Sequence, residues 1–148
     1  MGPKANGLPY FRPDGYLPEG MFIATEAEVT FRFGTATRQR RQLVLRVRRW
    51  IDLARRIGAP RLFIDGSFVT AKLEPNDVDA VVLLPYDFED QIATNVDAAT
   101  EFEEMLVTRR PEEIFAAEDE ADWNEWVEFF SRTREIDGRR KGLVEVEL

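Results

Sequence analysis

The fold is decided by "GSFVTAKLEPNDVDAVVLLP", residues 66–85, where a Gly-Ser pair is separated by nine residues from an Asp-Val-Asp group. The apolar run after the second aspartate ends at a proline and is typical of a buried strand. Alternate residues of a strand lie about 6.5 Å apart on one side, so Asp77 and Asp79 should project together, with Val78 and Val81 toward the core. Two like charges so close repel each other, which indicates a cation between them.

Composition limits the chain to one domain without histidine or cysteine chemistry. Its 148 residues, 44% of them hydrophobic, supply one ordinary core, so we expect a single domain over 1–148 with an extended arm at 1–24. The absence of Cys and His excludes disulfides, the usual zinc sites and histidine acid–base catalysis. Any chemistry therefore depends on carboxylates, hydroxyls, Lys or Arg.

The sequence contains no candidate membrane segment. No stretch is apolar over the roughly 20 residues that a membrane-spanning helix requires. The N-terminal segment "MGPKANGLPYF" also lacks the apolar centre of a signal peptide. We therefore expect a cytoplasmic protein with no membrane partner.

The net charge of −8 divides unevenly along the chain. Residues 1–72 carry 13 Lys and Arg against 6 Asp and Glu, whereas residues 73–148 carry 7 against 22. In the basic half, Arg41, Arg48 and Arg55 are seven residues apart and nearly aligned on one helix. Such a row either contacts the phosphates of an RNA or is simply a solvated helix face with surface ion pairs.

Hydrophobic spacing and turn residues predict the remaining elements. Thr25 and Glu28 fit a capping box for a short helix that ends at Gly34, and apolar residues at helical spacing extend a second helix over 35–57. Further strands are predicted at 61–67, 77–85, 113–117 and 141–148, and further helices at 95–110 and 119–133. This interleaving predicts an α/β or α+β class, with a small mixed β-sheet flanked by helices.

The Gly-Ser pair and the two aspartates suit a site for phosphate and metal. Gly66 lets backbone N–H groups approach a phosphate closely, and the hydroxyl of Ser67 adds a donor. Mg²⁺ or Mn²⁺ prefers carboxylate oxygens, and Mg²⁺ also keeps several waters and takes ligands from substrate phosphates. The alternative is structural, because Asp77 could cap the turn at "PND" while Asp79 pairs with an arginine.

The same stretch resembles the signature of the DNA polymerase β-like nucleotidyltransferase superfamily: an apolar strand, Gly-Ser, about ten residues, and Asp-x-Asp on a second strand. Together with "LPEGMFIATEAEVTFRFG", "DWNEWVEFFSRTRE" and "KGLVEVEL", it is similar to small, largely uncharacterised bacterial minimal-nucleotidyltransferase-like proteins. The resemblance implies Mg²⁺ held by carboxylates and transfer of a nucleoside monophosphate from a nucleoside triphosphate (NTP) to an acceptor hydroxyl on a protein or an RNA.

Carried over residue by residue, the resemblance assigns the Gly-Ser pair to the β- and γ-phosphates and the two aspartates to the metal. The superfamily commonly adds a third carboxylate on a later strand. The best match is Glu113, as a metal ligand and catalytic residue, although it departs from the usual aspartate. Lys72, between the two motifs, and the basic group Arg139, Arg140 and Lys141 are further candidates for contact with phosphate.

Three functions stay open at the level of sequence. The first is an active nucleotidyltransferase. The second is a protein of the same fold that binds a partner, for instance one component of a toxin–antitoxin pair, with weak or no catalysis. The third is an RNA-binding protein that uses the row of arginines. The first two are compatible, since an antitoxin can act by nucleotidylating its toxin.

Overall fold

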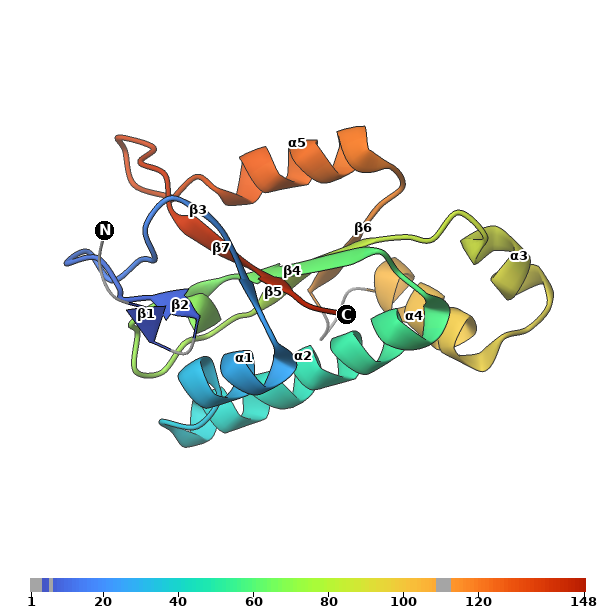
Figure 1. Cartoon of the computed structure of the whole chain (residues 1–148), viewed down its shortest axis with the longest axis horizontal. Helices are drawn as coiled ribbons and strands as arrows, with labels where there is room; N and C mark the ends of the chain where they lie inside the picture. Colours follow the sequence, from blue (N-terminus) through green and yellow to red (C-terminus); the bar gives the residue numbers. More distant parts are fainter. Residues whose placement is uncertain (1–3, 6, 109–112) are drawn as a thin grey trace.

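A computed structural model describes residues 4–5, 7–108 and 113–148. One mixed five-stranded sheet lies between two helical layers (Figure 1). Helices α1 (Glu26–Phe33), α2 (Arg38–Ile57) and α4 (Asp97–Thr108) cover one face, and α5 (Glu120–Phe130) covers the other. The predicted α+β class is therefore confirmed. None of the described helices is long and apolar enough to cross a membrane.

The strand order in the sheet is β3-β7-β4-β5-β6. Its strands are β3 (Gly20–Ala24), β4 (Arg61–Asp65), β5 (Asp79–Leu83), β6 (Ile114–Ala117) and β7 (Gly142–Val146). Strand β4 is antiparallel to both of its neighbours, whereas β3 is parallel to β7 and β6 is parallel to β5. The central hairpin-like pair, β4 and β5, is joined by the Gly-Ser stretch, so this stretch lies at one end of the sheet.

The N-terminal region is more ordered than the predicted arm. Residues 20–24 form β3, an edge strand, and a short antiparallel pair joins β1 (Lys4–Ala5) to β2 (Leu8–Pro9). The sequence pattern did not predict β3. This strand lies at the edge of the sheet with one partner, and its buried and exposed residues do not alternate regularly. Residues 1–3 and 6 of the predicted arm lie outside the described residues.

The helix boundaries follow the capping residues. The side chain of Thr25 accepts the backbone N–H of Glu28, and the carboxylate of Glu28 accepts the N–H of Thr25, so the predicted capping box is confirmed. Thr37 caps α2, which therefore begins at Arg38 rather than at residue 35, and Gly58 ends it in the left-handed conformation. The last two residues of the predicted helix 95–110 lie outside the described residues.

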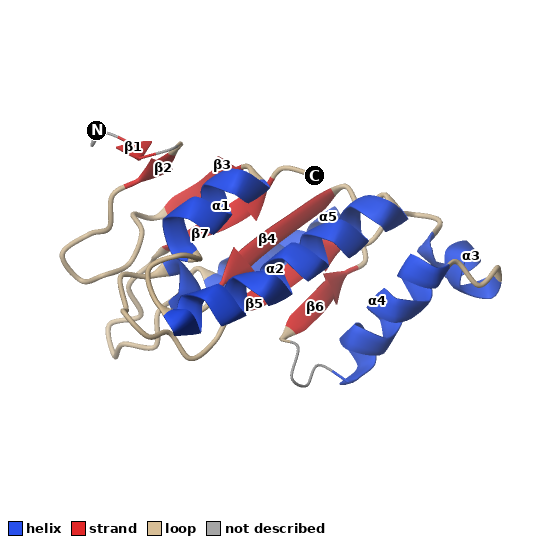
Figure 2. Cartoon of the chain, turned by 90° about the horizontal axis from the view of Figure 1, so that it is seen from below, coloured by secondary structure: helices blue, strands red, loops and turns tan. Residues whose placement is uncertain are grey.

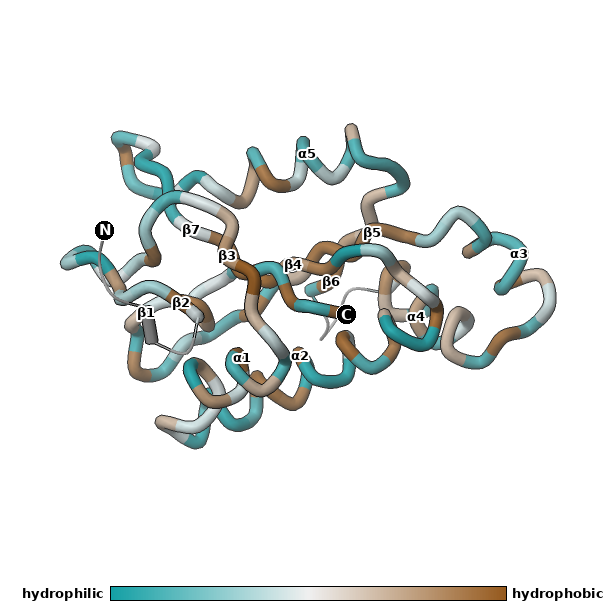
Figure 3. The backbone as a smooth tube through the Cα atoms, viewed as in Figure 1, coloured by the Kyte–Doolittle hydropathy of each residue, from teal (hydrophilic) through white to brown (hydrophobic). Residues whose placement is uncertain are grey.

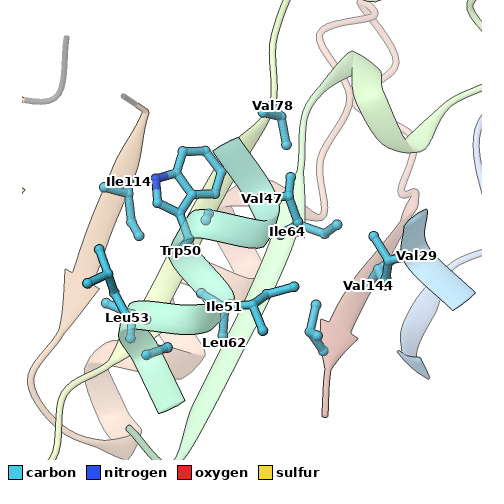
Figure 4. Packing of buried hydrophobic residues seen from close by; sticks show 14 of the residues in the cluster. Val29, Val47, Trp50, Ile51, Leu53, Leu62, Ile64, Val78, Ile114 and Val144 are labelled. Carbon is cyan, nitrogen blue, oxygen red and sulfur yellow. The ribbon is translucent and has the colours of Figure 1, made fainter. Parts of the chain in front are cut away.

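The larger part of the core lies between α2 and the sheet (Figure 4). Trp50 and Ile51 of α2 are fully buried, with the Trp50 ring toward Ile114 of β6 and Ile51 beside Leu62 of β4. Figure 2 shows α2 running along the central strands, and Figure 3 shows that α2 and α5 alternate between hydrophilic and hydrophobic residues along their length. Such alternation is expected of helices with one solvated side.

Two predictions of detail are corrected. Val81 does not share the face of Val78, because residues three apart in a strand point to opposite sides. Val78 packs under α2, and Val81 packs under α5 on the same face as Asp79; both valines are buried because helices cover both faces. The short helix α3 (Phe88–Ala93) was also not predicted, since its six residues are too few to show helical periodicity.

Candidate functional site

Three carboxylates lie in one row across the end of the sheet. Asp65, the last residue of β4, is the direct partner of Asp79, the first residue of β5. The register of β5 with β6 pairs Ala80 with Ile114, so Glu113 lies beside Asp79 on the other side. Laterally neighbouring residues of a sheet point to the same face, and here it is the face that α5 covers. We call Asp65, Asp79 and Glu113 the carboxylate row.

Asp77 joins this row from the segment just before β5 and is held by the Gly-Ser loop. Ser67 donates its hydroxyl to Asp77 Oδ1 (2.5 Å) and its backbone N–H to the same oxygen (3.2 Å). The Ser67 hydroxyl also accepts the backbone N–H groups of Asn76 and Asp77. The serine predicted to contact phosphate thus orients one of the aspartates in this structure.

Gly66 occupies a position that only glycine fits. Its φ of +92° lies in a region that other residues rarely adopt. A Cβ at this position would also lie 2.9 Å from Asp77 Oδ2 and 3.0 Å from the carbonyl oxygen of Asp77. The glycine therefore allows the loop after β4 to pass directly against the Asp-Val-Asp segment, which brings Asp77 and Asp79 together with the backbone N–H groups of the loop.

A buried arginine fixes the same loop from the opposite side. Arg40 of α2 is 5% exposed and donates to the carbonyl oxygens of Phe33 (3.1 Å), Phe68 (2.6 Å) and Thr70 (2.6 Å), and also to that of Lys72. Burial lowers its pKa, and carbonyl oxygens rather than a carboxylate satisfy its guanidinium. The arginine therefore fastens residues 68–72 to the start of α2.

Replacing Arg40 with methionine is expected to lower the free energy of unfolding by about 2–4 kcal/mol, because several buried carbonyl oxygens lose their donor. Urea unfolding measures this loss, and amide hydrogen exchange at residues 67–72 should become faster. The matched control is Arg38→Met, which removes an exposed arginine two residues away on the same helix. Equal stability of the two variants would show that Arg40 does not hold the loop.

The carboxylate row faces a cleft of about 1140 Å³. The loop that follows β4 forms one wall, residues 13–16 of the N-terminal segment form another, and the end of α5 with residues 132–134 forms a third. Ala71 donates its backbone N–H to the carbonyl oxygen of Gly15 (2.9 Å), so the first two walls are bonded to each other. A cleft of this size is large enough for a cofactor-sized ligand.

The environment of the row raises the pKa of two carboxyl groups. Burial raises the pKa of Asp79 to about 7, and the charges of Asp77, Asp65 and Glu113 add to the effect. Burial also raises the pKa of Asp65 to about 6, although Lys141 opposes the increase. The raised pKa of Asp79 means that its negative charge is unfavourable in this environment, and such perturbed carboxyl groups in a cleft often mark functional sites.

Lys141 neutralises one end of the row. Its Nζ lies 2.6 Å from both carboxylate oxygens of Asp65, and both side chains are buried. Among the described residues, no Lys or Arg forms an ion pair with Asp77, Asp79 or Glu113. Along the ends of β7, β4, β5 and β6, the charged side chains therefore follow the order Lys141, Asp65, Asp79 and Glu113.

The structure brings the predicted site residues into one cleft. Its lining includes the Gly-Ser pair, Lys72, both predicted aspartates, Glu113 and Lys141. Arg139 and Arg140 lie outside the lining, because they pair with Asp137 and Glu128, respectively. Sequence reasoning missed Asp65, although its position at the end of an apolar strand, next to Gly-Ser, was a usable signal.

The row of arginines on α2 is partly neutralised. Arg48 and Arg55 both pair with Glu26 of α1, at 3.0 and 2.6 Å, and Arg55 also donates to the carbonyl oxygen of Glu147. Arg41 donates to the carbonyl oxygen of Thr35. These contacts agree with the solvated-face interpretation, although the single carboxylate of Glu26 offsets only part of the charge of the three arginines.

The chain matches one protein-family model over nearly its whole length. Residues 9–147 match the model of a family described as a family of unknown function (DUF6932). The chain is a member of this DUF6932 family. No curated protein and no solved structure matches it. The description of the DUF6932 family names no activity or ligand, so the cleft itself has to indicate the chemistry.

The carboxylates in the cleft of this DUF6932 protein suit a hard cation that takes only some of its ligands from the protein. Within the ranges that the structure describes, no group of three or more Asp, Glu, His or Cys side chains converges as a metal site. Asp77 and Asp79 are close enough to share a hydrogen bond and have no ion-pair partner in the described part of the chain, so the pair fits a metal that takes one or two carboxylates. Mg²⁺ binds in this way, with waters and substrate phosphates as its other ligands.

Proposed function

We propose that this chain is a nucleotidyltransferase dependent on Mg²⁺ or Mn²⁺, which transfers a nucleoside monophosphate from an NTP to a hydroxyl of a protein or RNA acceptor in the cytoplasm. One observation carries the proposal. Asp77 and Asp79 lie together beside a glycine loop, have no ion-pair partner among the described residues, and face a cleft large enough for a nucleotide. The resemblance of residues 66–85 to nucleotidyltransferases supports the same reaction.

Asp77 and Asp79 would hold the metal that accompanies the NTP. The chemistry it would supply there is neutralisation of negative charge on the phosphates and in the transition state of the transfer. The β- and γ-phosphates would lie against the loop after Gly66. Because the backbone N–H groups of Ser67 and Phe68 donate to Asp77 in this structure, they would reach the phosphates only by exchanging those bonds. Lys72, exposed at the edge of the cleft, adds a positive charge that has no carboxylate partner among the described ion pairs.

The reaction is a displacement at the α-phosphorus. The acceptor oxygen forms a bond to this phosphorus while the bond to the bridging oxygen of the β-phosphate breaks, and pyrophosphate leaves with that oxygen. The proton of the acceptor hydroxyl passes to a carboxylate, for which Glu113 at the end of the row is our candidate. Most of the rate enhancement would come from positioning and from charge neutralisation.

A second function, binding of a partner without efficient transfer, is favoured by one observation. The described residues do not form a group of three metal ligands, and a second metal is what commonly supports rapid displacement. A component of a toxin–antitoxin pair that keeps the fold for recognition would have this property. Co-purification of a partner, together with NTP binding but no transfer, would favour this second function.

Calorimetric titration tests the shared first step. We expect the protein to bind an NTP at least about tenfold more tightly with Mg²⁺ than with EDTA, which corresponds to about 1.4 kcal/mol. Asp77→Asn/Asp79→Asn should remove this dependence, while Glu103→Gln, the loss of an exposed carboxylate on α4, should not. Titrations with ATP, GTP, CTP and UTP extend the test to each base. Binding that is the same with and without Mg²⁺ would refute the proposed site.

A further inference from the structure

A group of aromatic side chains borders the cleft on the side of α5. Phe115 of β6 and Trp126, Phe129 and Phe130 of α5 contact one another, with ring centroids 4.9 to 6.1 Å apart. Phe130 also packs on Phe63 of β4 at 5.9 Å, which anchors the group to the sheet. We call Phe115, Trp126, Phe129 and Phe130 the aromatic group.

The strand register places this group next to the carboxylate row. Phe63, Val81 and Phe115 are direct neighbours across β4, β5 and β6. They form the row that lies two residues along the strands from the carboxylate row, on the same face. Phe130 packs on two of these three residues, so the aromatic group begins where the carboxylate row ends.

Phe129 is the most exposed member of the aromatic group, whereas the other three side chains are half-buried. Its side chain is 66% exposed, it lines the cleft, and its ring stands edge-on to those of Phe130 and Trp126. An exposed phenylalanine on a flexible loop would lose much freedom when it bound a ligand. Phe129 lies instead in the last turn of α5 against two other rings, so its ring is already oriented and a ligand gains contact at low entropic cost.

We propose that Phe129, supported by Phe130, is the stacking surface for the nucleobase of the NTP. The inference rests on the proposed function and adds the direction in which the nucleotide lies. The phosphates meet the loop after Gly66, the α-phosphate lies at the carboxylate row, and the base lies toward the end of α5. Arg134, exposed on the adjoining wall without an ion pair among the described residues, adds positive charge to the cleft.

The chemistry of stacking also predicts the specificity. Every base has an aromatic face, and the ring of phenylalanine carries no hydrogen-bonding group that could read the edge of a base. The site should therefore accept all four NTPs, with a preference for purines over pyrimidines of less than about tenfold, because purines cover more of the ring. Strong selection of one base would require polar groups at positions that the aromatic group does not supply.

The test compares an NTP with a triphosphate that has no base. With Mg²⁺ present, Phe129→Ala is expected to bind ATP about 5- to 100-fold more weakly than wild type, in keeping with the usual contribution of one stacked base. Its affinity for inorganic tripolyphosphate should stay unchanged. Phe129→Tyr, which keeps an aromatic face, should bind ATP within about threefold of wild type. Quenching of tryptophan fluorescence by ATP, lost in Trp126→Phe, provides an independent readout because the Trp126 ring contacts Phe129.

Each outcome separates the two proposals. Equal binding of ATP by wild type and Phe129→Ala overturns the stacking site and leaves the transferase standing. A parallel loss for ATP and tripolyphosphate in Phe129→Ala also overturns it, since the variant would then have disturbed the phosphate end. If wild type binds neither compound, both proposals fail. If wild type is a dimer and Phe129→Ala a monomer, with unchanged affinity for ATP, Phe129 serves self-association and the stacking site is refuted.

Discussion

Asp79→Asn is expected to slow Mg²⁺-dependent transfer from a labelled NTP at least about 1,000-fold and, without divalent ions at pH 8, to stabilise the fold by about 1–3 kcal/mol. The two effects have one cause. Asp79 is a half-buried carboxylate beside Asp77, Asp65 and Glu113, and this environment raises its pKa to about 7. Removing its charge relieves this repulsion and also removes a metal ligand.

The pH dependence of stability follows from the same shift in pKa. An aspartate in the unfolded chain has a pKa near 3.9, so between about pH 4 and 7 the folded state binds more protons at Asp79 than the unfolded state does. The free energy of unfolding should therefore fall as pH rises through this window, and Asp65, with a pKa of about 6, contributes in the same direction. Asp79→Asn should flatten this slope.

Other carboxylates act in a different pH range. The pKa values of Asp14, Glu26, Glu128 and Asp137 are lowered, first of all by hydrogen bonds from arginine except at Glu26, where the arginines outweigh an opposing effect of burial. Their contribution to stability is present above their unfolded pKa and is lost only as pH falls below about 4. Thermal unfolding between pH 5 and 8 in EDTA, with Glu103→Gln as the control, therefore isolates Asp79 and Asp65.

The same experiment has a result that would contradict the site. If Asp79→Asn unfolds more easily than wild type at pH 8, then the charge of Asp79 is already stabilised by contacts within the fold and does not require a bound cation. Added Mg²⁺ together with an NTP should raise the melting temperature of wild type and leave that of Asp79→Asn unchanged. Equal increases in the two proteins would place the ligand elsewhere.

Local patterns were enough to predict most of the elements around the site. The capping box at Thr25 and the glycine after α2 each depend on neighbouring residues alone, and the structure has both. Gly66 and the Asp-Val-Asp group could also be placed at one end of the sheet, because the two strands that carry them are joined by the loop between them.

Contacts between distant segments could not be predicted in this way. The pairing of Lys141 with Asp65 joins residues 76 positions apart, and the wall formed by residues 13–16 depends on β3 packing beside β7. Neither follows from spacing. The hydrogen bond from Ser67 to Asp77 could not be predicted for a related reason: a hydroxyl next to such a loop can bond either to a ligand or to the protein.

Lys141→Met is expected to lower the free energy of unfolding at pH 8 by about 3–5 kcal/mol, because it leaves a buried carboxylate without its cation. Asp65 is 2% exposed, and Lys141 reaches both of its oxygens at 2.6 Å. Urea unfolding in EDTA measures the loss. The matched control is Arg49→Met, which breaks the surface ion pair with Glu101 and should cost at most about 1 kcal/mol.

A second substitution separates the ion pair from simple packing. Asp65→Asn/Lys141→Met removes both charges, so it should lose less stability than Lys141→Met alone, even though it changes one more residue. Lowering the pH to 5 should also reduce the cost of Lys141→Met, since Asp65 then takes up a proton; its pKa is about 6 with Lys141 in place and rises when Lys141 is removed. A loss that is the same at pH 5 and 8, and additive in the double variant, would mean that Lys141 acts through its hydrocarbon chain alone.

The pair also determines what the rest of the row can do. Asp65 is the direct neighbour of Asp79 in the sheet, so without Lys141 its negative charge would add fully to the repulsion at Asp79. Lys141→Met should therefore raise the pKa of Asp79 further, and the pH at which Mg²⁺ and an NTP bind half-maximally should increase. Asp65→Asn should shift that pH in the opposite direction. Equal midpoints in the two variants would show that the charge on Asp65 does not reach the neighbouring aspartates.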